Sequence, residues 1–98
     1  MVLNTIQALV NFNGKPLQEM VDGKLVDITV RTVTVNVLLS PKEKDKGTDK
    51  IRKYDLAMRI YKEDSVQLTL EEATLIKELV GEAFGPIVVG QLYKMLEA

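Results

Sequence analysis

Acidic side chains are the main groups in this chain that could carry catalysis. Glu63, Asp64, Glu71 and Glu72 are candidates for general acid and base chemistry, which needs two carboxyl groups close together. The chain has no His and no Cys, so the commonest general base, the thiolate nucleophile and the usual zinc ligands are missing. Glu71 and Glu72 have a simpler explanation, because they follow Thr69 in a helix-capping pattern. The sequence therefore predicts no enzyme, no metal site, no cofactor and no small-molecule substrate.

A basic segment at residues 42–53 could contact phosphate groups. Its cations are Lys42, Lys44, Lys46, Lys50, Arg52 and Lys53. Three acids dilute it, no aromatic side chain is interleaved, and the whole chain has a net charge of −1. Proteins that bind duplex DNA usually carry a basic excess. A solvated loop is the simpler interpretation, and a small nucleic-acid-binding regulator is the alternative function.

A second candidate surface is the corner at residues 85–91. Gly85 suits the position after a helix and Pro86 the first position of the next one. Gly90 inside a helix costs about 1 kcal/mol relative to Ala, so we expect it to allow close packing of the last two helices. The other interpretation is a partner-binding surface shared with the last helix. Its residues would be Gly85, Pro86, Ile87, Val89, Gly90 and Gln91.

The elements that must position these groups begin with a β-rich part at residues 1–28. Alternating apolar residues predict a first strand, and Asn13-Gly14 and Asp22-Gly23 are strong hairpin signals. A two-residue first turn would place Val10 opposite Leu17. The two turns cannot both be tight. One would make Leu17 hydrogen-bonded to the strand before it and the other to the strand after it, whereas the N–H and C=O of a strand residue point to one side only. We expect one longer or bulged turn, with the first and third segments paired or the second segment loose.

Residues 29–39 support two predictions. Apolar residues at 30, 33, 37 and 38 follow a helical period, and Thr29 can cap such a helix. Seven of the nine residues from Thr29 to Val37 are β-branched, which favours a strand.

The remainder, within residues 29–98, is predicted to be mainly helical. A charged loop at 42–50 precedes a helix capped by Thr48 or Asp49, and the apolar spacing after Thr69 and after Pro86 predicts two more helices. Met20, Met58 and Met95 are expected in the core. The whole is one α+β domain, residues 1–98, with an N-terminal β-hairpin or small antiparallel sheet followed by three or four helices.

No stretch reaches the 18 or so apolar residues that a membrane span needs, and the first ten residues have no basic region typical of a signal peptide. We therefore expect a cytoplasmic protein that does not bind membranes. Apolar helical stripes on so small a chain favour self-association or a protein partner over a nucleic acid.

Four sequence blocks carry a resemblance to a known group, and they span about the last two-thirds of the chain. They are Val35-Asn36-Val37-Leu38-Leu39, Lys53-Tyr54-Asp55-Leu56-Ala57, Leu68-Thr69-Leu70-Glu71-Glu72 with Ile76-Lys77, and Gly85-Pro86-Ile87-Val88-Val89-Gly90-Gln91. Together they resemble small phage- and prophage-encoded proteins of uncharacterised function. The resemblance implies a helix at 29–39 and brings no catalytic residues. It implies a non-catalytic accessory protein in the host cytoplasm, acting in virion assembly or by binding a host factor.

Overall fold

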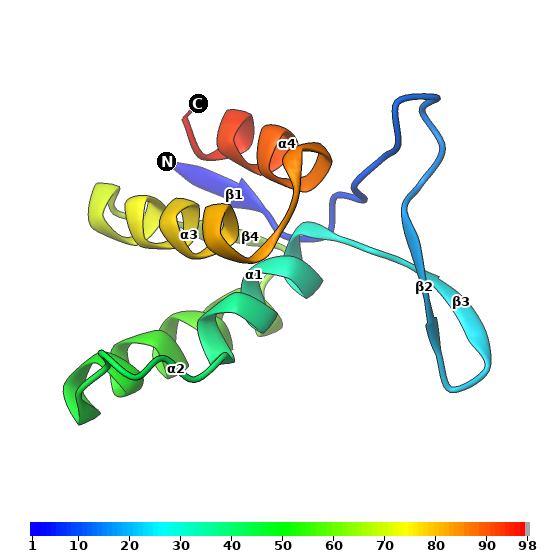
Figure 1. Ribbon diagram of the computed structural model, residues 1–98. Coiled ribbons are helices and arrows are strands. Elements are labelled where there is room, and N and C mark those ends of the chain that lie inside the picture. The colour runs from blue at the N-terminus through cyan, green and yellow to red at the C-terminus, as the bar shows by residue number, and fades with distance from the viewer. Residues whose placement is uncertain (98) are drawn as a thin grey trace.

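The computed structural model describes residues 1–97, which form an α+β fold with two small antiparallel sheets and four helices (Figure 1). The helices are α1 (Val30–Leu39), α2 (Gly47–Lys62), α3 (Leu70–Ala83) and α4 (Pro86–Leu96). The strands are β1 (Val2–Asn4), β2 (Gln18–Val21), β3 (Lys24–Asp27) and β4 (Ser65–Gln67). Within residues 1–97, no helix combines the length and the apolar character that crossing a bilayer requires.

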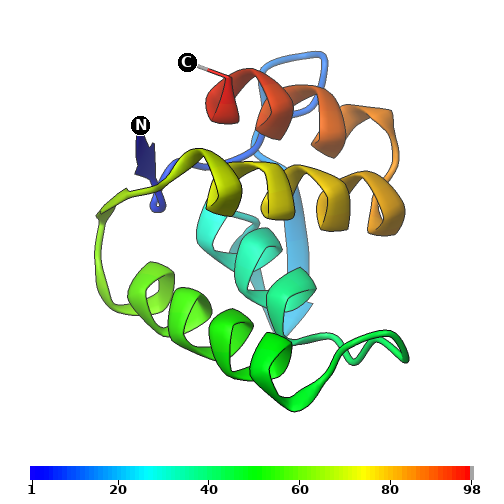
Figure 2. The ribbon, with the colours of Figure 1, turned by 90° about the vertical axis from the view of Figure 1, so that its left-hand side faces the viewer.

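Helix α1 lies at the centre of the fold, between α2 on one side and α3 on the other (Figure 2). Helix α4 covers the far side of α3. The core is formed between these helices, and Ile60 of α2, Ile76 of α3 and Leu92 of α4 are fully buried in it. This helical core gives the short strands and the N-terminal segment a rigid surface to attach to.

The helical prediction for residues 29–39 is confirmed. Thr29 caps α1, because its side-chain oxygen accepts a hydrogen bond from the Thr32 N–H at 3.3 Å. The predicted stripe, which includes Val30, Val33 and Val37, is buried. Burying one such side chain contributes about 1.5–3 kcal/mol, whereas the helix propensity of a β-branched residue costs at most about 0.7 kcal/mol. Burial therefore outweighs the local preference for strand.

The first strand is shorter than the alternation predicts. β1 ends at Asn4, and its centre, Leu3, pairs with Val66 of β4, both being buried. Residues 5–12 form no continuous strand and take part only in isolated bridges, at Ala8 and Val10. The segment is interrupted because its backbone bonds are divided among several partners further along the chain.

The two turns differ as expected, and the first is the longer. Asp22 and Gly23 have φ angles of 50° and 79°, which is the type I′ geometry of a two-residue hairpin. The Asn11 N–H donates to the carbonyl of Lys15 at 2.8 Å, so residues 12–14 form a three-residue loop. As a result Val10 pairs with Pro16, and the predicted pairing with Leu17 is wrong.

Three segments meet in a closed ring of hydrogen bonds. The Leu9 N–H donates to Ile28 O at 2.9 Å, the Ile28 N–H to Leu17 O at 2.8 Å, and the Leu17 N–H to Leu9 O at 2.8 Å. Leu17 thus uses its N–H toward one neighbour and its C=O toward another, which the sequence argument had excluded for a regular strand. The expected pairing of the first and third segments is present at the Ala8–Thr29 bridge.

The helix starts follow local chemistry, with one correction. At α3 the Thr69 hydroxyl accepts from the Glu72 N–H at 3.1 Å, and the Glu72 carboxylate accepts from the Thr69 N–H at 2.9 Å, which confirms the predicted capping box. Helix α2 begins at Gly47, earlier than predicted, with Lys46 as its N-cap residue. There Asp49 accepts from the Lys46 N–H at 3.0 Å.

Candidate protein-interaction surfaces

The most exposed feature of the molecule is a β-hairpin, residues 18–27, which we call the hairpin arm. It consists of β2, the Asp22-Gly23 turn and β3, and all eight strand residues are exposed. Figure 1 shows the arm projecting away from the helices. An isolated two-stranded hairpin is only marginally stable in water, so an unsupported arm of this kind is suited to a contact with another surface.

Both faces of the hairpin arm carry apolar side chains. Met20 and Leu25 are cross-strand partners on one face and are 66% and 63% exposed. Val21 and Val26 lie on the other face, because successive strand residues point to opposite sides, and they are also exposed. Phe12, in the separate 12–14 loop, is 97% exposed. The expectation that Met20 lies in the core is therefore wrong.

The base of the hairpin arm is held firmly. Leu9 is completely buried, and its backbone belongs to the hydrogen-bonded ring with Leu17 and Ile28. From the other side, Gln91 of α4 binds the backbone of Val10 through two hydrogen bonds of 2.9 Å. The fold thus positions the arm while leaving its outer half free of the helices.

The six residues of the predicted corner at 85–91 differ in their exposure. Ile87, Val89 and Gln91 are half-buried against the protein, whereas Gly85, Pro86 and Gly90 are exposed. Pro86 is the first residue of α4, as predicted, and Gly85 directly follows the C-cap residue of α3, as predicted, where it is also the N-cap residue of α4. The six residues therefore do not form one open surface, and Gln91 supports the arm.

The predicted packing role of Gly90 is wrong. A Cβ atom at Gly85 or Gly90 would meet nothing within 4 Å. The close approach between α3 and α4 occurs instead at Gly81, where a Cβ atom would lie 2.7 Å from the Tyr93 hydroxyl oxygen. That hydroxyl donates to the carbonyl of Lys77 at 3.0 Å, so Tyr93 occupies the space that Gly81 leaves.

The basic segment does not present a uniform positive surface. The Lys53 ammonium is largely buried and forms an ion pair with Asp45, with an N–O distance of 2.5 Å. Lys42 pairs with Glu82 at 3.0 Å. The part of the chain that the structure describes shows no ion pair for the remaining four cations, all exposed: Lys44, Lys46, Lys50 and Arg52. Two of the six predicted phosphate contacts are therefore engaged in ion pairs within the chain, one buried and one at the surface.

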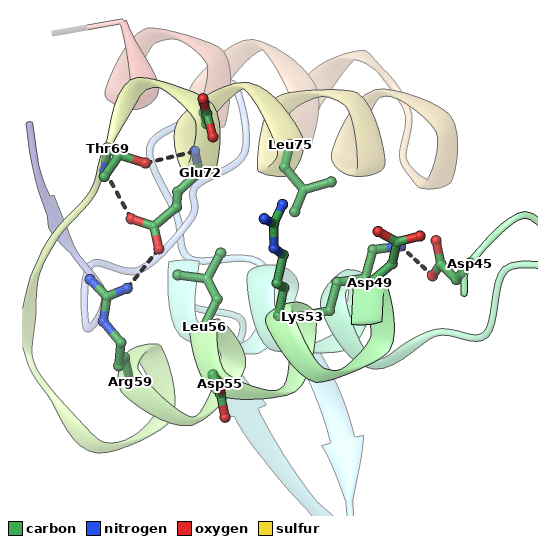
Figure 3. A pocket seen from close by; sticks show the side chains of 11 residues that line it. Asp45, Asp49, Lys53, Asp55, Leu56, Arg59, Thr69, Glu72 and Leu75 are labelled. Carbon is green, nitrogen blue, oxygen red and sulfur yellow. Dashed lines mark hydrogen bonds and ion pairs between the residues drawn. The ribbon is translucent and has the colours of Figure 1, made fainter. Parts of the chain in front are cut away.

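A charged cleft of about 560 Å³ lies between α2 and the start of α3 (Figure 3). Figure 3 shows Arg59 reaching toward Glu72, with an N–O distance of 2.7 Å. The cleft is lined by five acids and three cations: Asp45, Asp49, Asp55, Glu71, Glu72, Arg52, Lys53 and Arg59. This mixture suits neither a phosphate chain nor a metal ion, and within residues 1–97 no cluster of three acids has the geometry to hold a metal.

Two of the four carboxylates considered for acid and base chemistry, those of Glu72 and Asp64, have partners in the fold. Burial alone would raise the pKa of Glu72, but hydrogen bonds from the Thr69 N–H and from Arg59 outweigh it and hold the pKa below its ordinary value. Glu72 therefore stays ionised and is a poor proton donor. At the end of α2, Arg31 donates to the backbone carbonyl of Glu63 at 3.0 Å and to the carboxylate of Asp64 at 3.1 Å.

Comparisons with protein-family models, with curated proteins and with solved structures give no match to this chain. The functional argument therefore rests on the surface features themselves. Sequence reasoning predicted a hairpin at Asp22-Gly23 but missed that both of its faces are exposed. The signal for this was present in the order of residues, because Met20-Val21 and Leu25-Val26 place two large apolar residues next to each other, and adjacent positions in a strand face opposite sides.

Proposed function

We propose that this chain is a non-catalytic phage or prophage accessory protein that acts by protein–protein interaction, through its hairpin arm. The observation that carries the proposal is the arm itself, with apolar side chains exposed on both faces and, within residues 1–97, no helix packed against it. The resemblance of the last two-thirds of the chain to small phage-encoded proteins supplies the biological setting, either virion assembly or binding of a host factor.

The area of the arm fits this role. Met20, Val21, Leu25 and Val26 together offer roughly 330 Å² of exposed apolar surface on the two faces of the arm, taking about 150 Å² for a fully exposed large side chain. A standard interface buries about 800 Å² on each partner, and rather more than half of that, about 450 Å², is apolar. A partner that encloses both faces of the arm would therefore bury most of the apolar area that one interface needs.

The arm can also use its backbone. Among the described residues, β2 and β3 form a two-stranded sheet with each other alone, so each has an outer edge whose N–H and C=O groups can extend a partner's sheet. Strand addition of this kind gives affinity through main-chain hydrogen bonds, and the flanking side chains give specificity. Both contributions come from the same ten residues, which makes the arm a separable docking element.

An arm-less variant tests the proposal. Leu17 and Ile28 are already hydrogen-bonded across the base of the arm at 2.8 Å, so residues 18–27 can be replaced by Asn-Gly, which closes a two-residue turn between them. We expect this variant to keep the helical circular dichroism spectrum of the parent. Both proteins serve as baits in lysate of the host, with bound proteins quantified by mass spectrometry.

Proteins, including further copies of the chain, that bind the parent and are lost with the arm-less variant support the proposal. The same bound set for both baits would contradict it. Recovery of the chain in purified particles after prophage induction would then favour virion assembly, and recovery only with host proteins would favour a host factor.

A further inference from the structure

Helix α2 has a second apolar face, which the described part of the fold leaves uncovered. Ile51, Tyr54 and Tyr61 are 63%, 54% and 63% exposed, and Met58 between them is half-buried. We call these four residues the outer stripe. An apolar stripe at helical spacing is usually the face that a helix buries in its own fold. Here α2 buries a different set, which is Lys53, Leu56, Ala57 and Ile60.

The outer stripe lies on the free side of α2. Successive residues of a helix are turned by about 100°, so the stripe points away from Arg52 and Arg59, which line the charged cleft beside α3. Figure 2 shows α2 as the outermost helix of the stack, with α1 and α3 both to one side of it. The stripe is therefore open to a partner that approaches α2 from outside.

The spacing of the outer stripe indicates that this partner is another helix. Its members follow one another at intervals of three, four and three residues, which is the pattern of the seam between two helices of a coiled coil. A short helix on its own is only marginally stable, but α2 is already held in place by its buried face. The fold therefore presents half of such a seam ready formed.

The charges beside the outer stripe complement each other between two copies of α2. Lys50 lies on one side of the stripe and Asp55 on the other; both are exposed, and within residues 1–97 neither forms an ion pair. In a parallel pair of helices, the residue directly before a seam position faces the residue five positions further along the other helix. Lys50 of each copy then meets Asp55 of the other.

The same charges select the orientation of the pair. In the parallel arrangement the remaining flanking residues, Ala57 and Lys62, bring no like charges together. An antiparallel pair centred on the stripe would instead place the two copies of Asp55 on the same side and close to the centre of the contact. Charges beside a helical seam set partner choice and orientation in this way, so the sequence of α2 favours a second α2 in parallel.

The area of the outer stripe suits a dimer of modest affinity. Its three exposed side chains offer roughly 330 Å², taking about 200 Å² for a fully exposed Tyr and about 150 Å² for Ile. That is about three quarters of the apolar area on one side of a standard interface. In a parallel pair each residue meets its own copy, and Ile51 stands at a seam position where a β-branched residue favours two strands.

From these features we infer that two copies of the chain pair their α2 helices in parallel along the outer stripe. The contact is isologous, because both copies use the same surface, and it closes at two copies. The inference goes beyond the proposed role of the hairpin arm and does not depend on it, since the stripe and the arm belong to different elements. A dimer of this kind carries two arms.

Sedimentation equilibrium over a concentration series gives the first test. We expect the mass to rise with concentration from the 11.0 kDa of one chain to twice that value. Tyr54→Glu places a charge in the seam and should keep the mass of one chain throughout. Leu70→Glu, the same kind of change at an exposed apolar residue of α3, is the matched control and should dimerise like wild type. A monomeric wild type overturns the inference, as does a Tyr54→Glu variant that still dimerises.

Charge reversal beside the seam provides the decisive measurement. Lys50→Glu sets two acids against each other across the contact, and Asp55→Lys sets two lysines against each other, so each variant should dimerise about tenfold more weakly than wild type. Mixed in equal amounts, the two variants restore an opposite-charge pair on both sides of the seam, and a one-to-one dimer of wild-type affinity is expected. A mixture that associates no better than either variant alone overturns the inference. So does an unchanged affinity of Lys50→Glu, which an antiparallel pair would show.

These results separate the dimer from the proposed function. None of the substitutions lies in the hairpin arm, so arm-dependent capture from host lysate by the Tyr54→Glu variant tests the arm without the dimer. If the chain stays monomeric and capture still depends on the arm, the dimer is overturned and the proposed function stands. If the charge-reversal mixture dimerises and capture does not depend on the arm, the dimer stands and the proposed function is overturned.

Discussion

The side-chain amide of Gln91 binds both backbone groups of Val10, 81 positions earlier in the chain. The Val10 N–H donates to Gln91 Oε1 and Gln91 Nε2 donates to the Val10 carbonyl, each at 2.9 Å. The same nitrogen also donates to the carbonyl of Ile87 at 2.7 Å. A side chain on α4 thus takes the place of a neighbouring strand and fixes the segment that leads into the hairpin arm.

Gln91→Ala should loosen that segment. We expect a loss of about 1–2 kcal/mol in the free energy of unfolding, since water can replace the lost bonds at an exposed backbone only in part. The Val10 amide should also exchange its hydrogen faster. Gln7→Ala is the control, because Gln7 is exposed on the same segment and shows no side-chain hydrogen bond within residues 1–97. Equal melting temperatures for the two variants would contradict a bracing role for Gln91.

Arg31 joins three parts of the fold, and its removal should be costly. Its guanidinium donates to the Ile60 carbonyl at 3.0 Å, to the buried Thr5 hydroxyl at 3.2 Å and to Glu63 O at 3.0 Å. Arg31→Ala should lower the free energy of unfolding by about 3 kcal/mol, because bonds from a charged donor contribute about 1.5–3 kcal/mol each and are not additive.

Arg31→Lys should recover less than half of that loss, since an ammonium cannot reproduce the planar array of donors. Arg52→Ala, an exposed cation, should change stability by no more than about 0.5 kcal/mol. Urea denaturation of the three variants measures these differences. A lysine variant as stable as wild type would show that only the charge of Arg31 matters.

The sequence was most informative where local chemistry decides the structure. Thr69 and Glu72 are three positions apart, and the side chain of each accepts a hydrogen bond from the backbone N–H of the other. The start of α3 could therefore be predicted without knowledge of the fold. The Asp22-Gly23 turn is equally local. At α1 the β-branched residues opposed the periodic pattern, and the outcome depended on burial of residues such as Val33 against two other helices.

The candidate site was harder to predict because it depends on which side chains are left uncovered by the helices and on contacts between residues far apart in the sequence. Met20 is an apolar side chain of the kind usually found in a core. It is 66% exposed because, within residues 1–97, no helix covers this face of the hairpin arm. Gln91 was expected in a partner surface, but its partner is a backbone segment near the other end of the sequence. Similarly, Lys53 is paired with Asp45, which no count of charges along the chain could reveal.

The hydrogen bond from the Thr69 N–H to Glu72, together with the ion pair between Glu72 and Arg59, should make stability depend on pH in the acid range. The pKa of Glu72 is lowered in the folded chain, so its contribution is present above the ordinary glutamate pKa of about 4.3 and is lost as the pH falls through and below that value. Glu72→Gln should therefore be less stable than wild type at pH 7, and the two should converge toward pH 3. Glu71→Gln, on the same helix turn but exposed, is the control. Parallel stability profiles for wild type and Glu72→Gln would contradict the assignment.

The two glycines of α3 and α4 should respond oppositely to alanine. At Gly90 the space is open, so Gly90→Ala should raise the free energy of unfolding by about 0.5–1 kcal/mol through helix propensity alone. At Gly81 the same gain is opposed, because the new Cβ lies 2.7 Å from the Tyr93 hydroxyl oxygen and displaces its bond to Lys77. That bond is worth about 1 kcal/mol, so Gly81→Ala should be neutral or destabilising.

Tyr93→Phe distinguishes this explanation from a general effect of alanine. In that background the hydroxyl is absent, and Gly81→Ala should recover the gain seen at Gly90. Denaturation curves should be compared at a concentration where the chain is monomeric, with association measured separately. If Gly90→Ala stabilises the single chain yet weakens its association, the open face of α4 contacts a partner. If it stabilises the chain and leaves association unchanged, the contacts made by the hairpin arm do not extend to this face.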